Sequence, residues 1–434
     1  MRKSISILLS LLLMLSCLPV LAEVPAEFID YAGQLRLNMA SETVKAPVTV
    51  KTFIDGDTTH FYVSESVSES GVLKARYLAV NTPETTGKIE EYGKKAADFT
   101  REKLTNAVSI IVESDTASWN FDSTGERRLV WVWYQPEEGA EYRCLNLELL
   151  QNGLCIANST ANNRYGSICM NALNQARSAK LNVYSGQKDP DFYYGDAIEL
   201  TLRELRTNLE AYNGKKVAFT GVVTMNNNNS VFVENYDAES GIYYGMSVYY
   251  GYGLSGTGLN ILNVGNEVRI VGTLQYYEAG GTWQVSGLTY RMMKPDDPGN
   301  IQKLSEGHAP AYFLTEAETF VGGTVTLKEE EGEKSFPYAQ MAMATSIEMH
   351  GLTVKDAYTT DNEESSSNGA ITLYCEKDGL TVLVRTAVLT DASGELVTQD
   401  AFIGKTIDVR GVVDFYDGTY QIKVLTYNNI TFYN

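Results

Sequence analysis

The chain has 434 residues and a formal net charge of −19 at pH 7. Its three histidines are too few for a site built from clustered imidazole ligands. The excess of acidic residues argues against nucleic-acid binding through a large positively charged surface. Most of the excess lies in residues 186–434, with 17 basic and 33 acidic residues, whereas residues 46–185 contain 14 basic and 17 acidic ones.

The N-terminus has the pattern of a targeting segment. Basic residues are followed by an apolar run over 5–15 and by the small residue Ala22, which predicts a signal peptide at 1–22 and a secreted protein. Cys17 leaves lipoprotein anchoring as an alternative. A lead segment, 23–45, follows, and no later apolar run approaches the length of a membrane span.

Residues 46–186 have the periodicity of a small α+β domain. Apolar and polar residues alternate as in strands over 48–54, 59–63, 73–80, 108–113 and 129–134. Helices are expected over 90–106, 146–152 and 166–180, the last with apolar residues at helical spacing. Five strands with interleaved helices predict a closed barrel of the oligonucleotide-binding (OB) type with flanking helices.

Charged and polar side chains gather near the ends of these expected strands. Carboxylate, amide and carbonyl oxygens suit a hard cation such as calcium, and arginine forks hold phosphate oxygens bidentately. A nearby glutamate could orient or deprotonate water. The combination indicates metal-assisted phosphodiester hydrolysis. The residues are Asp55, Asp57, Arg76, Asn81, Thr82, Glu84 and Arg127.

The set lies within a series of six short sequence motifs in a fixed order. Together these motifs resemble the staphylococcal nuclease (thermonuclease) family over residues 48–185. The motifs are 50–58, 76–85, Tyr92-Gly93, 125–129, 149–154 and 179–185. The resemblance implies cleavage of DNA and/or RNA leaving 3′-phosphates, with Ca2+ as cofactor. It also implies that Asp57, Asn81 and Thr82 bind the metal, that Arg76 and Arg127 stabilise the transition state, and that Glu84 acts on the attacking water.

Three positions depart from the family pattern. Asn81 replaces a metal-binding aspartate, which removes about 1 kcal/mol of attraction per unit of cation charge in water and about 4 kcal/mol at a protein-surface dielectric. Thr124 and the 158–159 pair stand where the family has base-pocket tyrosines. One inserted residue before Arg127 also makes Arg128 the alternative second arginine.

Residues 186–434 contain a repeated pattern. The spacing Gly-x-x-apolar-x-apolar-x-Gly begins at Gly214, Gly265 and Gly404, and the second and third copies both continue with Gly-Thr-aromatic-Gln. This match predicts two related all-β domains at 196–294 and 311–434, each another OB-like barrel. The chain as a whole is therefore expected to be mainly β.

The connecting segments of this half are also readable. A short amphipathic helix is expected over 200–212, ahead of the first repeat, and a linker rich in proline, aspartate and glycine over 295–307. A tyrosine-rich surface could stack bases or sugar rings, but filling of a barrel core and its rim is the preferred interpretation. The ligand of the two C-terminal domains stays unassigned. These aromatics are Tyr243, Tyr244, Tyr249, Tyr250, Tyr252, Tyr276, Tyr277 and Trp283.

The remaining cysteines and the single histidine of residues 46–186 favour structural roles. Cys144, Cys155 and Cys169 are interpreted as apolar fillers on helices, and an even total with Cys375 leaves a disulfide open. Strand alternation points His60 away from Asp57, so it is expected to be structural.

The sequence favours a secreted, monomeric, calcium-dependent nuclease with DNA and/or RNA as its substrate. Two alternatives remain. A weakened nuclease-like domain would bind nucleic acid without cutting it, as the asparagine at position 81 suggests. The tyrosine-rich barrels would instead make the chain a cell-surface or glycan-binding protein.

Overall fold

The structure is a computed structural model that describes residues 28–329, 332–362, 365 and 367–433. The predicted signal peptide and Cys17 lie outside the described residues. Within the described part of the chain, no helix is both long enough and apolar enough to cross a membrane.

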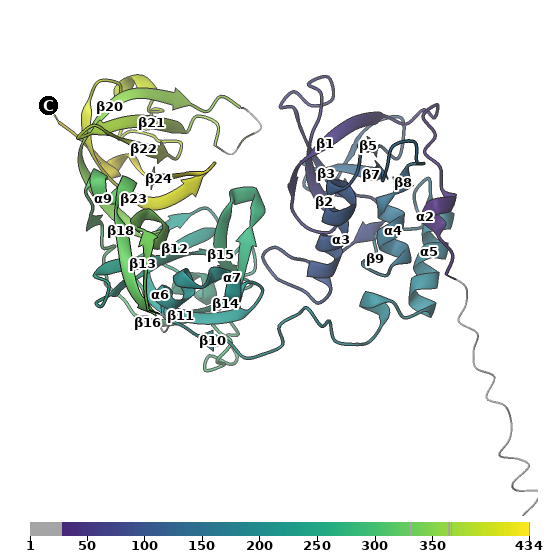
Figure 1. Cartoon of the computed structure of the whole chain (residues 1–434), viewed down its shortest axis with the longest axis horizontal. Coiled ribbons are helices and arrows are strands. Elements are labelled where there is room, and N and C mark those ends of the chain that lie inside the picture. Colours follow the sequence, from purple (N-terminus) through teal and green to yellow (C-terminus); the bar gives the residue numbers. More distant parts are fainter. Residues whose placement is uncertain (1–27, 330–331, 363–364, 366, 434) are drawn as a thin grey trace, which may run out of the picture.

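The first barrel closes from five strands, and its labelled strands β1, β2, β3, β5 and β7 lie at the right of Figure 1. β1 pairs with β2 and β5, and β3 pairs in parallel with β7, which joins the sheet edges. The resulting order, 1-2-3-5-4, is that of an OB barrel, as predicted. Its strands are β1 (Lys45–Phe53), β2 (Thr58–Tyr62), β3 (Val72–Tyr77), β5 (Ser109–Glu113) and β7 (Arg128–Gln135).

The described residues form two further barrels with the same strand order, so the mainly β, three-barrel prediction is confirmed. The middle barrel closes through β11–β14 pairing and the third through β20–β23 pairing. The middle strands are β11 (Lys216–Asn227), β12 (Ser230–Asp237), β13 (Ile242–Tyr249), β14 (Glu267–Tyr277) and β15 (Thr282–Ser286). The third barrel has β20 (Ser346–Thr359), β21 (Ile371–Lys377), β22 (Leu380–Thr386), β23 (Thr406–Tyr416) and β24 (Thr419–Val424).

Shorter strands extend these sheets or form two separate pairs, β4 with β9 and β18 with β19. β16 (Gln302–Ser305) pairs with β14 and lies within the stretch that the sequence suggested as a linker. The others are β4 (Val80–Asn81), β6 (Asn120–Phe121), β8 (Arg143–Cys144), β9 (Ile156–Ala157), β10 (Ile198–Glu199), β17 (Phe313–Leu314), β18 (Thr324–Glu329), β19 (Gly332–Pro337) and β25 (Ile430–Phe432).

The repeated glycine has a physical reason. Gly221, Gly272 and Gly411 close the three copies of the pattern and lie on β11, β14 and β23. A Cβ at each would come within 2.6 Å of a carbonyl oxygen on the neighbouring strand. Only glycine admits so close an approach, which the tight coiling of a small barrel requires. The second and third copies occupy the equivalent fourth strand of their barrels.

Helices flank the first barrel where the sequence predicted them, with ends shifted by a few residues. They are α3 (Gly93–Thr105), α4 (Leu145–Gln151) and α5 (Gly166–Ser178). Part of the lead segment docks on the same side through α2 (Tyr31–Gln34). The Asp30 carboxylate there accepts hydrogen bonds from Arg143, at 2.9 Å, and from Gln151, at 3.0 Å.

The single helix predicted over 200–212 is wrong. The segment forms α6 (Leu202–Thr207) and α7 (Leu209–Tyr212), which are separated at Asn208. The Asn208 amide donates to the Glu204 carbonyl oxygen at 3.1 Å, and its backbone leaves the helical region at φ −131°. Asparagine side chains compete in this way for backbone groups and interrupt helices.

Short helical segments complete the described elements. The α-helices are α8 (Thr257–Ile261), α9 (Ala317–Gly322) and α10 (Tyr338–Met341). The 3-10 turns are Asn182–Tyr184, Glu278–Gly280, Gln399–Ala401 and Tyr427–Asn429.

The cysteine interpretation needs one correction. The four described cysteines are buried and free, so no disulfide joins them. Cys169 lies on α5, but Cys144 ends β8 and Cys155 lies in the loop after α4. They fill the core as expected, although two of them do so from outside helices.

The two C-terminal barrels share one core. A single cluster of buried apolar residues runs through both, and polar contacts fix their junction. Glu234 on β12 accepts hydrogen bonds from Ala311 N and from Ser346 N and Oγ, at 2.6–2.8 Å. Buried Arg206 donates to the carbonyl oxygens of Gly245 and Met343.

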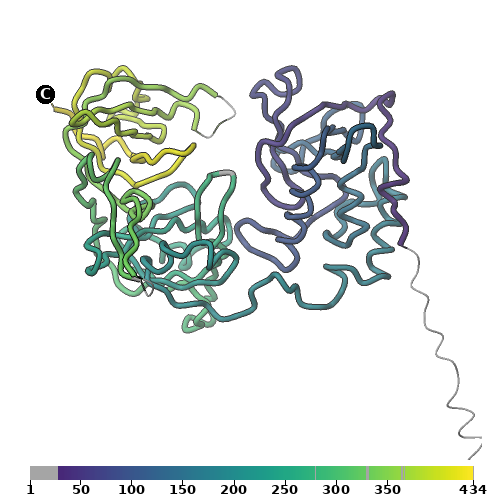
Figure 2. Tube along the Cα trace, viewed as in Figure 1, coloured from purple at the N-terminus to yellow at the C-terminus, as the bar shows by residue number. Residues whose placement is uncertain are grey.

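The first barrel also contacts the middle one. In Figure 2 the loop between β4 and α3 reaches toward the middle barrel, and the connecting segment after α5 runs beneath both. A Cβ on Gly287 would lie 3.2 Å from the Gly87 carbonyl oxygen. Arg101 on α3 pairs with Glu278 at 2.7 Å. These contacts enclose a space between the two barrels.

Candidate active site

The turn between β1 and β2 holds two carboxylates in the interior. Ile54 N and Asp55 N donate to the Thr58 carbonyl oxygen at 3.1 and 3.3 Å, which closes the turn. Thr100 on α3 donates to the Gly56 carbonyl oxygen at 2.6 Å. A Cβ on Gly56 would lie 2.9 Å from side-chain atoms of α3 and of Thr82, so only glycine fits. Asp55 is 7% exposed and the next carboxylate, Asp57, is fully buried.

Asp57 lies at the centre of a polar network. The Arg76 guanidinium on β3 contacts both Asp57 Oδ1 and Asn81 Oδ1, and Thr82 N donates to Asp57 Oδ2 at 2.7 Å. Burial and the neighbouring charge of Asp55 raise the pKa of Asp57, whereas Arg76 and the Thr82 amide act in the opposite direction. A cation bound beside Asp55 and Asp57 would therefore offset the repulsion between the two carboxylates and the cost of burying their charge.

A cavity of about 530 Å³ lies beside the network and is lined by Arg76, Glu84 and Arg127, among others. Glu84 follows β4 in a loop closed by a hydrogen bond from Glu90 N to the Glu84 carbonyl oxygen, 2.9 Å. Burial and the Asp55 charge raise the pKa of Glu84, and Arg76 opposes the shift. Three segments separated along the chain thus bring Arg76, Glu84 and Arg127 to one cavity, which Asp55 and Asp122 also line.

Arg127 is held by a carboxylate of its own. Its Nε and Nη2 donate to Asp122 Oδ2 at 2.7 and 2.6 Å. Burial raises the pKa of Asp122, but hydrogen bonds from Thr124 and Arg127 outweigh that effect and lower it. Arg128 instead donates to the Val67 carbonyl oxygen at 2.8 Å and lies against two aromatic rings. Arg127, rather than its neighbour, lines the cavity.

The residues predicted to bind metal lie together beneath this cavity. Asp57 and Asn81 both direct an oxygen at the Arg76 guanidinium, and the buried Thr82 hydroxyl has no hydrogen-bond partner among the described residues. Asp55 is adjacent, since its Oδ1 accepts from Asp57 N at 3.0 Å. An oxygen-only set with two buried carboxylates and an orphaned hydroxyl fits a hard cation.

Carboxylates are nevertheless few at this place. Across the residues that the structure describes, no group of three or more His, Cys, Asp and Glu side chains is arranged to hold a metal ion. The candidate ligands are two carboxylates supplemented by amide, carbonyl and hydroxyl oxygens.

Sequence reasoning left two site residues without a role. Asp55 was visible in the Asp-Gly-Asp motif, but its charge beside Asp57 depends on the folded turn. Asp122 carried no motif, and its partnership with Arg127 arises because both lie on the hairpin of β6 and β7. Of the positions noted for missing tyrosines, Asn158 and Ser159 line the cavity.

Comparison with known proteins agrees with this geometry. The sequence model of the family described as "Staphylococcal nuclease homologue" matches residues 74–186. A thermonuclease of Staphylococcus intermedius is 31% identical over 139 residues, which cover 31% of this chain and 74% of that protein. A thermonuclease of Staphylococcus hyicus is 29% identical over 163 residues, 37% of this chain and 88% of that protein.

Proposed function

The chain belongs to the staphylococcal nuclease family, and we propose that it is a secreted, calcium-dependent nuclease that hydrolyses phosphodiester bonds of DNA and/or RNA. One observation carries the proposal: Arg76, Glu84 and Arg127 line a single cavity beside the buried Asp57. Phosphodiester hydrolysis needs cationic groups that hold the phosphate and a carboxylate placed to act on water, and these three residues supply both.

The two arginines would bind the phosphate and the charge that develops on it. The Arg127 guanidinium is already oriented by Asp122, so little order is lost when it binds phosphate, whereas Arg76 contacts Asp57 in this structure. The Arg127 side chain is 33% exposed and that of Arg76 only 13%. Incoming substrate would therefore meet Arg127 first.

Glu84 would orient the attacking water and accept its proton. A carboxylate in water is too weak a base for efficient proton transfer near neutral pH. Burial and Asp55 raise the pKa of Glu84, which makes it a better proton acceptor, and Arg76 and Arg127 oppose the shift. The residue is thus suited to a general base in a cavity that it shares with both phosphate-binding groups.

Calcium would be held by Asp57, Asn81 and the Thr82 carbonyl group, with Asp55 close by. When bound, it would polarise a non-bridging phosphate oxygen as a Lewis acid. Because Asn81 is neutral, we infer weak affinity, in the range of roughly 10⁻⁴ to 10⁻³ M that extracellular calcium sites commonly show.

One observation favours a second candidate, a domain that binds nucleic acid without cutting it. Arg76 bridges the oxygens of Asp57 and Asn81, so a cationic side chain already compensates the groups that calcium would use. If Arg76 stays there, both its phosphate contact and the metal site are lost. The calcium dependence of cleavage decides between the two candidates.

The proposal is tested by cleavage of single-stranded DNA and RNA by the purified mature protein across a calcium titration. Activity should rise with millimolar calcium and be lost in Glu84→Gln and in Arg76→Ala. Arg36→Ala is the matched control, because Arg36 and its partner Glu141 are exposed and neither lines the cavity. Binding of both nucleic acids without cleavage at any calcium concentration would leave the binding domain as the function.

Secretion is a separate part of the proposal and rests on the N-terminal pattern alone. N-terminal sequencing of protein from the culture medium should give a mature chain beginning at Glu23. Material found only in the membrane fraction and labelled with fatty acid would instead support anchoring at Cys17.

A further inference from the structure

A cavity of about 1030 Å³ lies between the first and middle barrels. Its walls come from the loop 86–89 after β4, the connecting residues 192–195, the β11–β12 hairpin and the segment 249–253 after β13. Small-molecule sites measure roughly 300–1,000 Å³, so this volume suits a stretch of polymer.

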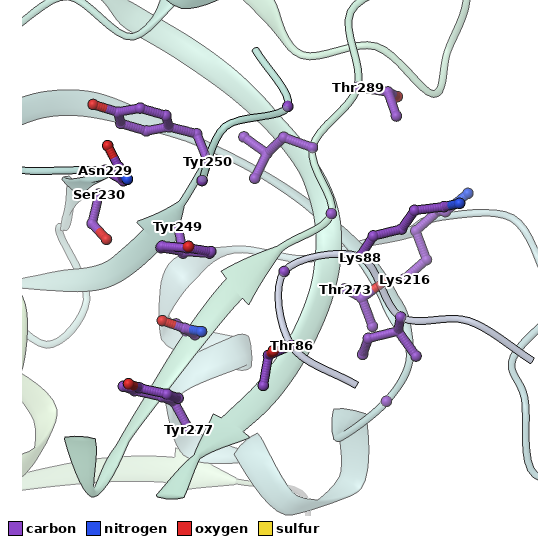
Figure 3. A pocket seen from close by; sticks show the side chains of 18 of the residues that line it. Thr86, Lys88, Lys216, Asn229, Ser230, Tyr249, Tyr250, Thr273, Tyr277 and Thr289 are labelled. Carbon is purple, nitrogen blue, oxygen red and sulfur yellow. The ribbon is translucent and has the colours of Figure 1, made fainter. Parts of the chain in front are cut away.

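The charge of the lining is opposite to that of the chain. Lys88 and Lys216 line the cavity, and none of the described residues around it is a carboxylate, in a protein of net charge −19. Lys216 has no ion pair with any described residue, and the Lys88 side chain, paired with Glu90, is 79% exposed. Both lie on the same side of the space in Figure 3. Such a lining favours an anionic ligand over a neutral polysaccharide.

Aromatic rings form the opposite side. Tyr249, Tyr250 and Tyr277 are half-buried in the wall, and Figure 3 shows the rings of Tyr249 and Tyr277 edge-on, one above the other. Asn229 lies next to Tyr250, whose hydroxyl donates to the Asn228 carbonyl oxygen at 2.6 Å. Flat rings with amides beside them suit unpaired bases, because stacking needs an open base face.

The cavity adjoins the candidate active site. Ile54 and Thr86 line both this space and the smaller cavity that contains Arg76 and Glu84. Ile54 directly precedes Asp55, and Thr86 is two residues after Glu84. A strand whose phosphate lies between the arginines would therefore continue past Thr86 into the larger space.

We propose that this cavity is a subsite for unpaired nucleotides of the DNA or RNA strand that is being cut. Bases would stack on Tyr249 and Tyr277, and the backbone phosphates would pass Lys88 and Lys216. The inference rests on the proposed nuclease function for the direction of the strand. It also makes the middle barrel part of substrate binding, through the hairpin between its first two strands, a place where OB barrels contact oligonucleotides.

The test separates binding from catalysis by using the full chain with Glu84→Gln. Fluorescence anisotropy would measure the Kd of labelled 12-nucleotide single-stranded DNA and RNA, a 12-base-pair duplex and a dinucleotide. Adding Tyr249→Ala should weaken binding of one or both single strands by about 5- to 150-fold, the value of one stacked base, and affect the dinucleotide less. Tyr416→Ala, an exposed tyrosine of the third barrel, should leave all four values unchanged.

A surface substitution protects the test against misfolding. Lys216→Gln changes an exposed side chain and should reduce the slope of log K against log salt by about 0.7 for single strands. Equal losses for the 12-mer and the dinucleotide, an unchanged Kd in both variants, or binding of polysaccharide but not of oligonucleotide would overturn the proposal. Tyr249-dependent binding, together with no cleavage by the chain that keeps Glu84, would support the subsite while refuting the nuclease function.

Discussion

Replacing Asn81 with aspartate should strengthen calcium binding. Asn81 Oδ1 already lies in the network around Asp57, so the added charge enters without rearrangement. Its attraction for one unit of cation charge at about 4 Å is about 1 kcal/mol in water and about 4 kcal/mol at a protein-surface dielectric. Asn81 is half-buried, which places it between these limits. A tighter hold on Arg76 opposes part of the gain, and we expect calcium to bind at least tenfold more tightly.

Isothermal titration calorimetry of the full chain with calcium measures the change directly. Asn171→Asp is the matched control, since it adds the same charge to an exposed position on α5. The calcium concentration for half-maximal cleavage should fall by the same factor in Asn81→Asp. An unchanged or weaker calcium Kd in that variant would refute the assignment of Asn81 to the metal site. Tighter calcium binding without any cleavage would support the assignment and leave the binding domain as the function.

Three further predictions follow from single contacts. Asp122→Asn removes the charged acceptor that orients Arg127. A hydrogen bond to a charged group contributes about 1.5–3 kcal/mol, so kcat/KM for oligonucleotide cleavage should fall about tenfold or more. An unchanged kcat/KM would show that Asp122 does not position the arginine. Burial, followed by the nearby charge of Lys74, lowers the pKa of His60 to about 4 from 6.5, so its contribution to stability is full above pH 6.5 and lost as pH falls toward 4. His60→Gln should therefore make urea stability less dependent on pH between 7 and 5, and an equal dependence in both proteins would contradict the buried, neutral imidazole. Glu234→Ala leaves the buried Ser346 donors without an acceptor, and urea unfolding of the C-terminal barrels should show a loss of about 1–3 kcal/mol, whereas no loss would mean that water replaces the carboxylate.

The barrels were predictable because their signals are local. Strand alternation reports which face of each strand is buried, and the first barrel has its strands within a few residues of the predicted ranges. The Gly-x-x-apolar-x-apolar-x-Gly repeat reflected a close strand approach at Gly272 and Gly411. The prediction of one helix over 200–212 was wrong because it rested on the spacing of apolar residues. That spacing gives no sign that the Asn208 side chain hydrogen-bonds the Glu204 carbonyl oxygen and interrupts the helix.

The site could be predicted only in part. The order of the motifs along the chain identified the candidate residues. The structure brings three of them, Arg76, Glu84 and Arg127, to one cavity. The choice between Arg127 and Arg128 could not be made from spacing, because Arg127 lies in the loop before β7 and Arg128 begins that strand, so the fold of the hairpin decides which one lines the cavity. The partner of Arg127, Asp122, belonged to no motif.

The sequence by itself determined three β-barrels, their order and the family of the first, because periodicity and motifs depend on neighbours along the chain. Only the tertiary structure decided that Arg76 bridges Asp57 and Asn81, and that Lys88 of the first barrel shares a cavity with Tyr249 and Tyr277 of the middle one. The tyrosines had been interpreted as core and rim residues in an acidic region with few cations. The two lysines of the cavity come from different barrels, Lys88 from the first and Lys216 from the middle one. A contact between segments so far apart along the chain leaves no periodic pattern in the sequence of either segment.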